Sequence, residues 1–239
     1  QKEKEFYKKV QKNIAEEFKN IITGVLNKKD QMVLIFELLL RLRQATIHPQ
    51  LVLNGYHKKG LFKSFKWDTL QSTKISLLLQ HIFTLQTTHP QDSSIVFTQF
   101  TQEIDTIKTL LTNHNISVAI IDGRTSLKQR THILNNQPKV LLLQIKAGAV
   151  GLNLQKYNHV FFTSPDWNPA NELQAVARTH RLGQLKQVYV TRFLLQNTID
   201  TKIIDIQNNK LTIIQQHLTQ QQQQQQQTPL INQIHNLLQ

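Results

Sequence analysis

Apolar residues recur along the first part of the chain at the spacing of one helix face. Seven of them lie three or four positions apart or side by side between residues 3 and 27: Phe6, Val10, Ile14, Phe18, Ile21, Ile22 and Val25. This period is typical of an amphipathic helix. A second helix is expected over residues 30–45, ending ahead of Pro49, because the residue before a proline is disfavoured in the helical conformation. Residues 54–67 are basic and contain glycine, and we expect a loop there.

Beyond residue 72 the pattern changes to short apolar runs that alternate with amphipathic segments. The runs predict strands at residues 94–100, 117–122, 140–144, 159–163 and 188–194. The segments between and around them predict helices at residues 74–85, 103–113, 127–135, 171–181 and 199–211. Such an alternation is typical of an α/β fold, with a parallel sheet that helices cover on both faces. In these sheets, ligands bind at the carboxyl ends of the strands.

The last part of the chain has a different composition. Glutamine fills every position from 220 to 227, and such a tract buries too little apolar surface to fold by itself. We therefore divide the chain into a helical segment (1–55), a basic loop (56–72), the α/β domain (73–212), a disordered glutamine-rich linker (213–229) and a short tail (230–239).

Charge and composition narrow the function classes. The chain has 28 Lys and Arg against 15 Asp and Glu, a formal net charge of +13, which favours a polyanionic partner such as nucleic acid. It has no cysteine, so disulfides and thiolate zinc sites are excluded, and we expect no metal site within it. No run reaches the roughly 18 apolar residues of a membrane span, and no signal peptide is visible. We expect neither secretion nor membrane insertion.

One helical pattern places two arginines where they can meet a phosphate. In the helix expected over 171–181, Gln174, Arg178 and Arg181 share a face at 100° per residue. Arginine is planar, always charged, and donates a fork of hydrogen bonds to phosphate oxygens. The neighbouring face predicts how the helix docks, through Leu173, Val176, Ala177 and His180. A solvated basic face is the alternative for any such arginine pair taken alone.

Small residues follow the strand expected at 140–144. Gly148 and Gly151 allow backbone amides to approach a phosphate closely, Lys146 adds a charge, and Asn153 follows two positions later. A plain strand-to-helix turn is the alternative interpretation.

Four ordered motifs and one segment that precedes them resemble one family. PDWNPANELQAVARTHRLGQ (165–184) resembles the signature of the second RecA-like lobe of Swi/Snf-type DNA-dependent ATPases, in helicase-like superfamily two. LLLQIKAGAVGLNL (141–154) is similar to the preceding motif of that lobe, and SIVFTQFTQEID and IIDGRTS match its opening strands in order. LLLRLRQATIHPQL (38–51) resembles the segment between the two lobes. The resemblance implies that 73–212 is a carboxy-terminal RecA-like lobe, preceded by the helical tail of a first lobe.

The resemblance also implies roles for individual residues. Arg181 would be the arginine finger, Arg178 a phosphate-sensing arginine, and Gln174 would fix their network. Gly148, Gly151 and Asn153 would bind nucleotide. Contacts to the nucleic-acid backbone are implied for Thr98, Gln99, Arg124, Thr125, Ser126, Lys146 and Trp167.

Trp167 and Gly123 also allow a purely structural interpretation. Trp167 can equally cover the core, and a turn accounts for Gly123 as well as a phosphate contact does. Two positions depart from the family pattern: Gln144 stands where relatives usually have serine or threonine, and Ala149 where glycine is common.

The implied activity is ATP hydrolysis coupled to movement along double-stranded DNA, in chromatin remodelling, repair or transcription. ATP and Mg²⁺ would be bound mainly by the first lobe, because this chain has neither GxxxxGK[ST] nor an acidic DExx-type strand end. We therefore expect a fragment or half of a split protein, inactive alone. Its partners would be duplex DNA, with nucleosomes as a candidate, and an amino-terminal RecA-like lobe in the same or another chain. It would be nuclear in a eukaryote, or lie in a viral replication compartment.

Two alternatives stay open. The chain could be an RNA helicase lobe, or a non-catalytic DNA or protein interaction module. DWNP together with THRLGQ speaks against the first, and the intact Arg178 and Arg181 speak against the second.

Overall fold

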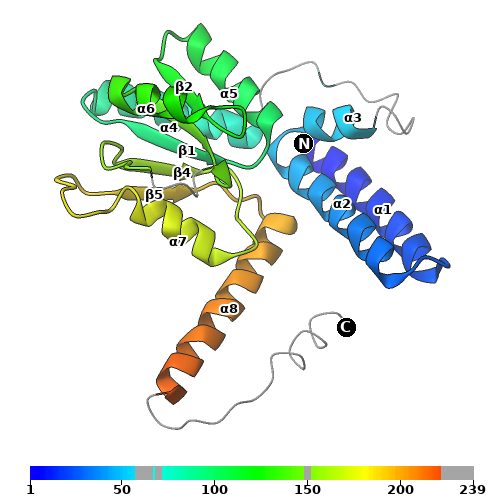
Figure 1. Ribbon diagram of the computed structural model, residues 1–239. Helices are drawn as coiled ribbons and strands as arrows, with labels where there is room; N and C mark the ends of the chain where they lie inside the picture. Colours follow the sequence, from blue (N-terminus) through cyan, green and yellow to red (C-terminus); the bar gives the residue numbers. More distant parts are fainter. Residues whose placement is uncertain (57–66, 68–71, 148–151, 222–239) are drawn as a thin grey trace.

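The first three helices form a hairpin with a short third arm (Figure 1). The computed structural model describes residues 1–56, 67, 72–147 and 152–221, with side chains up to residue 213. Helix α1 (Lys2–Thr23) packs against α2 (Lys28–Ile47), and α3 (Pro49–Tyr56) follows directly. The Asn27 side chain caps α2 by accepting a hydrogen bond from the Asp30 backbone N–H at 3.0 Å.

Both expected helices are confirmed, and α2 ends ahead of Pro49 as expected. Helix α3 was not expected. Proline is nevertheless suited to the first turn of a helix, because its missing N–H would have no partner there. The row of apolar residues that α1 buries is also shorter than expected. Phe6, Val10 and Ile14 are buried, whereas Phe18 is 40% exposed and Val25 is fully exposed.

Five parallel strands form one sheet in the order β2-β3-β1-β4-β5. The strands are β1 (Ser94–Thr98), β2 (Val118–Ile121), β3 (Val140–Gln144), β4 (His159–Phe162) and β5 (Tyr189–Arg192). All five were expected, and the predicted parallel α/β sheet is confirmed. Strand β1 lies at the centre, with Ser94 beside Val140 of β3 and His159 of β4. The carboxyl ends of β1, β3 and β4 therefore meet at one edge of the sheet.

Helices cover both faces of this sheet (Figure 1). On one face α4 (Thr73–Thr88) and α5 (Thr101–Asn113) pack on Val96, Leu142 and Phe161. On the other face α6 (Leu127–Asn136) and α7 (Pro169–Ala177) pack on the alternate residues, such as Leu141 and Phe162. Alternation arises because successive side chains of a strand point to opposite faces. The edge strand β5 is mostly exposed and is covered less than expected.

The last helix packs against the helices of the hairpin. Helix α8 (Ile199–Gln221) contributes Ile199 and Ile203 to a third cluster, which holds Phe6 of α1, Leu42 of α2 and Val52 of α3. Its far half projects away from the sheet (Figure 1). The helix runs to Gln221 rather than to the expected end near 211, so it enters the predicted linker. The rest of that linker, the tail and most of the basic loop lie outside the described residues.

Two kinds of feature are absent from the described residues. No helix there combines the length and apolar character needed to cross a membrane. Nor do His, Asp or Glu side chains there gather in a group of three or more that could hold a metal ion.

Candidate functional site

A cavity at the carboxyl end of β3 collects three of the expected site residues. Lys146, just beyond β3, lines it together with Gln174 of α7 and Arg178 at the end of α7. The cavity measures about 240 Å³, and Phe97 and Ile145 form its apolar wall. Three side chains that donate hydrogen bonds, two of them cationic, thus face one space.

The glycines expected beside this cavity, Gly148 and Gly151, lie outside the described residues. Asn153, expected to act with them, is exposed two residues beyond that gap. Its side-chain oxygen accepts a hydrogen bond from the Gln155 backbone N–H at 3.2 Å. Asn153 does not line the cavity, so its nucleotide contact stays a prediction.

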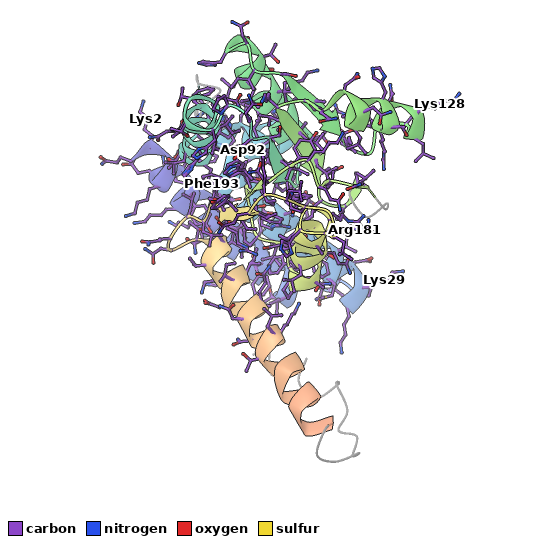
Figure 2. The ribbon with its side chains drawn as sticks, turned by 90° about the vertical axis from the view of Figure 1, so that its left-hand side faces the viewer. Lys2, Lys29, Asp92, Lys128, Arg181 and Phe193 are labelled. Atoms are coloured by element: carbon purple, nitrogen blue, oxygen red, sulfur yellow. The ribbon has the colours of Figure 1, made fainter. Side chains whose placement is uncertain are left out.

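Arg181 lies outside this cavity. Helix α7 ends at Ala177, and Arg178 is its C-cap, so the helical spacing expected to align Arg181 with Gln174 and Arg178 is wrong. Arg181 instead occupies an exposed turn that Gly183, with φ of +99°, helps to close. Figure 2 shows Arg181 beside α7 at the surface.

Of the residues expected to dock α7, only Val176 packs on the core, and the rest of the expected face is exposed. Leu173 is 55% exposed, and His180 is exposed beyond the helix end. The side chains that turn inward are those of Glu172, Ala175 and Thr179. The pattern of apolar residues did not predict that Glu172 is buried. Its carboxylate is paired with Arg192 at 2.7 Å.

The loop after β2 is held by its own side chains and by Asp105 of α5. Arg124 is paired with Asp122 at 2.7 Å and with Asp105 at 3.0 Å. The hydrogen bonds to Asp105 and Asp122 raise the pKa of Arg124 above its ordinary value. Thr125 Oγ1 accepts from the Asp122 backbone N–H at 3.1 Å, and Ser126 caps α6. Arg124 and Ser126 are exposed, so both remain accessible to a phosphate.

The two residues at the end of β1 differ in accessibility. Thr98 is fully buried, and its hydroxyl donates to the Leu143 carbonyl at 3.5 Å. A contact of Thr98 with nucleic acid, as expected from the sequence, is therefore not available in this structure. Gln99 is half-buried and donates to the Asp166 carboxylate at 3.4 Å.

Trp167 packs against the cluster formed by α1, α2, α3 and α8. The guanidinium of Arg43, from α2, lies 5.9 Å from the centre of its ring and also donates to the Pro165 carbonyl at 2.8 Å. These contacts favour the packing interpretation of Trp167. They also connect α2 to the loop after β4.

A buried ion pair joins the start of the lobe to α8. Lys74 Nζ lies 2.5 Å from Asp200 Oδ2, with the two side chains 2% and 0% exposed. Asp200 also accepts hydrogen bonds from the Thr46 hydroxyl at 3.1 Å and the Leu195 backbone N–H at 3.0 Å. Burial lowers the pKa of Lys74, and Asp200 opposes that shift. No sequence pattern predicts this pair, because local patterns do not relate residues so far apart along the chain.

Comparisons with known proteins agree on one family. The helicase conserved C-terminal domain matches residues 73–183. DNA repair protein RAD5 of Cryptococcus neoformans is 39% identical over 160 residues, which cover 64% of this chain and 13% of that protein. RAD5 of Saccharomyces cerevisiae is 37% identical over 172 residues, 67% of this chain and 14% of that protein. DNA repair protein rad8 of Schizosaccharomyces pombe is 38% identical over 149 residues, which cover 60% of this chain and 13% of that protein.

The chain thus spans 13 to 14% of the length of these relatives. Among solved structures, the C-terminal part of the Fun30 ATPase domain superposes with a TM-score of 0.66. The match covers 85% of this chain and 84% of that one at 22% identity. At that identity the likeness shows the fold.

Proposed function

Since the chain is a Swi/Snf-type carboxy-terminal RecA-like lobe of helicase-like superfamily two, we propose that it is the second motor lobe of an ATP-dependent double-stranded DNA translocase in DNA repair. The observation that supports this most is the cavity where Lys146, Gln174 and Arg178 converge at the end of β3. Nucleosomal DNA and chromatin remodelling stay within the proposal as candidate settings.

The side chains of the cavity suit a nucleotide phosphate better than a metal ion. Lys146 and Arg178 are cations and Gln174 can donate through its amide, while none of the described lining residues is a carboxylate. Mg²⁺ prefers oxygen ligands, usually carboxylates and phosphates, so Mg²⁺ would be held by the first lobe, where ATP supplies the phosphoryl group to be transferred. In this lobe Arg178 and Gln174 would bind and orient phosphate oxygens, and Arg181 would neutralise charge that develops in the transition state.

A second set of residues, which shares Lys146 with the cavity, would contact the DNA backbone. Lys146, Arg124 and Ser126 are exposed at the carboxyl-end loops of β3 and β2, and Gln99 is half-buried at the end of β1. Contacts of this type give affinity and position without reading sequence. Arg124 would exchange or share its two carboxylate partners when it meets a phosphate.

We therefore predict weak, sequence-indifferent binding of duplex DNA that falls steeply with salt. Each phosphate neutralised should contribute about 0.9 to the slope of log affinity against log salt, so Lys146→Ala should reduce that slope by about 0.9. The measurement is fluorescence anisotropy with two unrelated duplexes between low and physiological salt. Lys108→Ala, an exposed lysine of α5, is the matched control. An unchanged affinity across that salt range would contradict the prediction.

A further prediction separates the two interpretations of Trp167. Since the structure shows it packed beside Arg43, Trp167→Ala should lower the melting temperature of this chain, because truncating a buried aromatic ring costs about 3 to 5 kcal/mol at full burial and less where burial is partial. Trp167→Phe should retain most of the packing. In an enzyme that includes the first lobe, loss of translocation without any change in melting temperature would instead support a DNA contact.

The rival function within the same superfamily is an RNA helicase lobe. Stimulation of ATP hydrolysis by duplex DNA and by RNA, compared in an enzyme that contains both lobes, distinguishes the two. A non-catalytic interaction module would show neither stimulation.

A further inference from the structure

The turn that carries Arg181 is held by Gln184 from within the motif of residues 165–184, and by Leu154 and Gln155 from outside it. Because α7 ends at Ala177, the carbonyls of the next residues have no continuing helix to bond them. Four are nevertheless bonded: the Arg178 carbonyl accepts from the Leu154 backbone N–H at 3.3 Å, and the Arg181 carbonyl from the Gln184 backbone N–H at 2.9 Å. The Thr179 carbonyl accepts from the Gln184 side-chain amide at 3.3 Å, and the Leu182 carbonyl from the Gln155 side-chain amide.

Gln155 and Gln184 also bond to each other. The side-chain amide of Gln184 donates to the Gln155 backbone carbonyl at 2.6 Å, while the Gln184 side-chain oxygen accepts from the Lys186 backbone N–H at 2.9 Å. A side chain at Gly183 would meet the Gln155 amide, since a Cβ built there lies 3.4 Å from its nitrogen. Leu154, Gln155 and Gln184 together form what we call the glutamine clasp.

Part of the clasp lies on the same connection as Lys146. Leu154 and Gln155 lie eight and nine residues beyond Lys146, on the same connection from β3 to β4 that lines the cavity. The clasp therefore joins the segment proposed to contact phosphates to the turn that presents Arg181.

We propose that Gln155 is a positioning residue for ATP hydrolysis: its side-chain amide, bonded to the Leu182 carbonyl, fixes the turn from which Arg181 reaches the nucleotide. This inference rests on the proposed function of Arg181. Gln155 does not line the cavity, and it acts through the backbone of the turn. An arginine that stabilises the transition state must be held in place. If the backbone of its turn becomes mobile, the rate of hydrolysis falls, because even a small misplacement of a catalytic group is costly.

The test compares three variants in an enzyme that contains both lobes. Gln155→Met has a similar length but no donor, Gln155→Lys keeps an N–H donor, and Gln196→Met changes an exposed glutamine beyond the other end of β5. Loss of one hydrogen bond predicts a kcat about 3- to 10-fold lower for Gln155→Met. Its KM for ATP should stay within about twofold, because the finger acts in the transition state. Gln155→Lys and Gln196→Met should stay within about threefold of wild type.

Hydrogen exchange and melting of this chain supply a readout that does not depend on catalysis. Gln155→Met should speed amide exchange in residues 178–184 and leave α5 and the melting temperature unchanged. Wild-type kcat with unchanged exchange, or a loss in Gln155→Lys as large as in Gln155→Met, would overturn the proposal. Full turnover by Arg181→Ala would refute the role of Arg181, and the positioning role of Gln155 with it. The exchange data would then still show whether the clasp holds the turn.

Discussion

Replacing Arg181 by alanine should lower DNA-stimulated ATP hydrolysis by about 10³- to 10⁵-fold in an enzyme that contains both lobes, the usual effect of removing a finger arginine. That loss corresponds to roughly 4 to 7 kcal/mol of barrier, whereas an exposed ion pair is worth only about 0 to 1 kcal/mol. Arg181 is exposed in a turn, so its truncation leaves no cavity and should change the stability of the fold by less than about 0.5 kcal/mol.

Arg181→Lys is the sharpest companion variant, because lysine keeps the charge and loses the planar fork; we expect little rescue. Arg178 is a less clean test, since it is half-buried against the cavity and its truncation also disturbs the fold. This chain alone, which we expect to be inactive, provides the baseline. A loss smaller than about tenfold in Arg181→Ala would remove Arg181 from the catalytic residues.

The second large effect concerns stability. Asp200→Ala should lower the free energy of unfolding by about 3 to 5 kcal/mol, because it leaves the buried ammonium of Lys74 without its counter-ion. The change also removes the acceptor of the Thr46 hydroxyl and of the Leu195 backbone N–H. Urea denaturation of this chain, followed by circular dichroism, measures the difference.

Two controls separate the ion pair from general damage to α8. Asp205→Ala removes an exposed carboxylate of the same helix and should cost no more than about 0.5 kcal/mol. The double variant Lys74→Met, Asp200→Leu replaces both charges by apolar groups and should recover the part of the stability that is lost to the unpaired charge, but not the part lost with the hydrogen bonds of Thr46 and Leu195. A cost below about 1 kcal/mol for Asp200→Ala would show that the pair is not energetically important.

Much of the fold could be predicted from periodicity. Strand β3 was expected at its observed limits, and β1, β2, β4 and β5 within two residues at each end, because buried strands in an α/β sheet form short apolar runs bounded by turns. The helix predictions failed where one local sequence feature is compatible with two structures. A proline ends one helix and can begin the next, which is why α3 was missed. A buried carboxylate such as Glu172 turns inward when it has a partner, which is why the docking face of α7 was wrong.

The sequence by itself determined the family, the parallel α/β fold and the identity of the residues proposed to meet phosphate, because motif order and apolar spacing are local properties of the chain. Only the tertiary structure decided which of those residues converge. It placed Lys146 beside Gln174 and Arg178, moved Arg181 off the helix into a turn held by Gln155, and buried Thr98. These outcomes depend on hydrogen bonds and packing between segments far apart in sequence, and no periodicity encodes them.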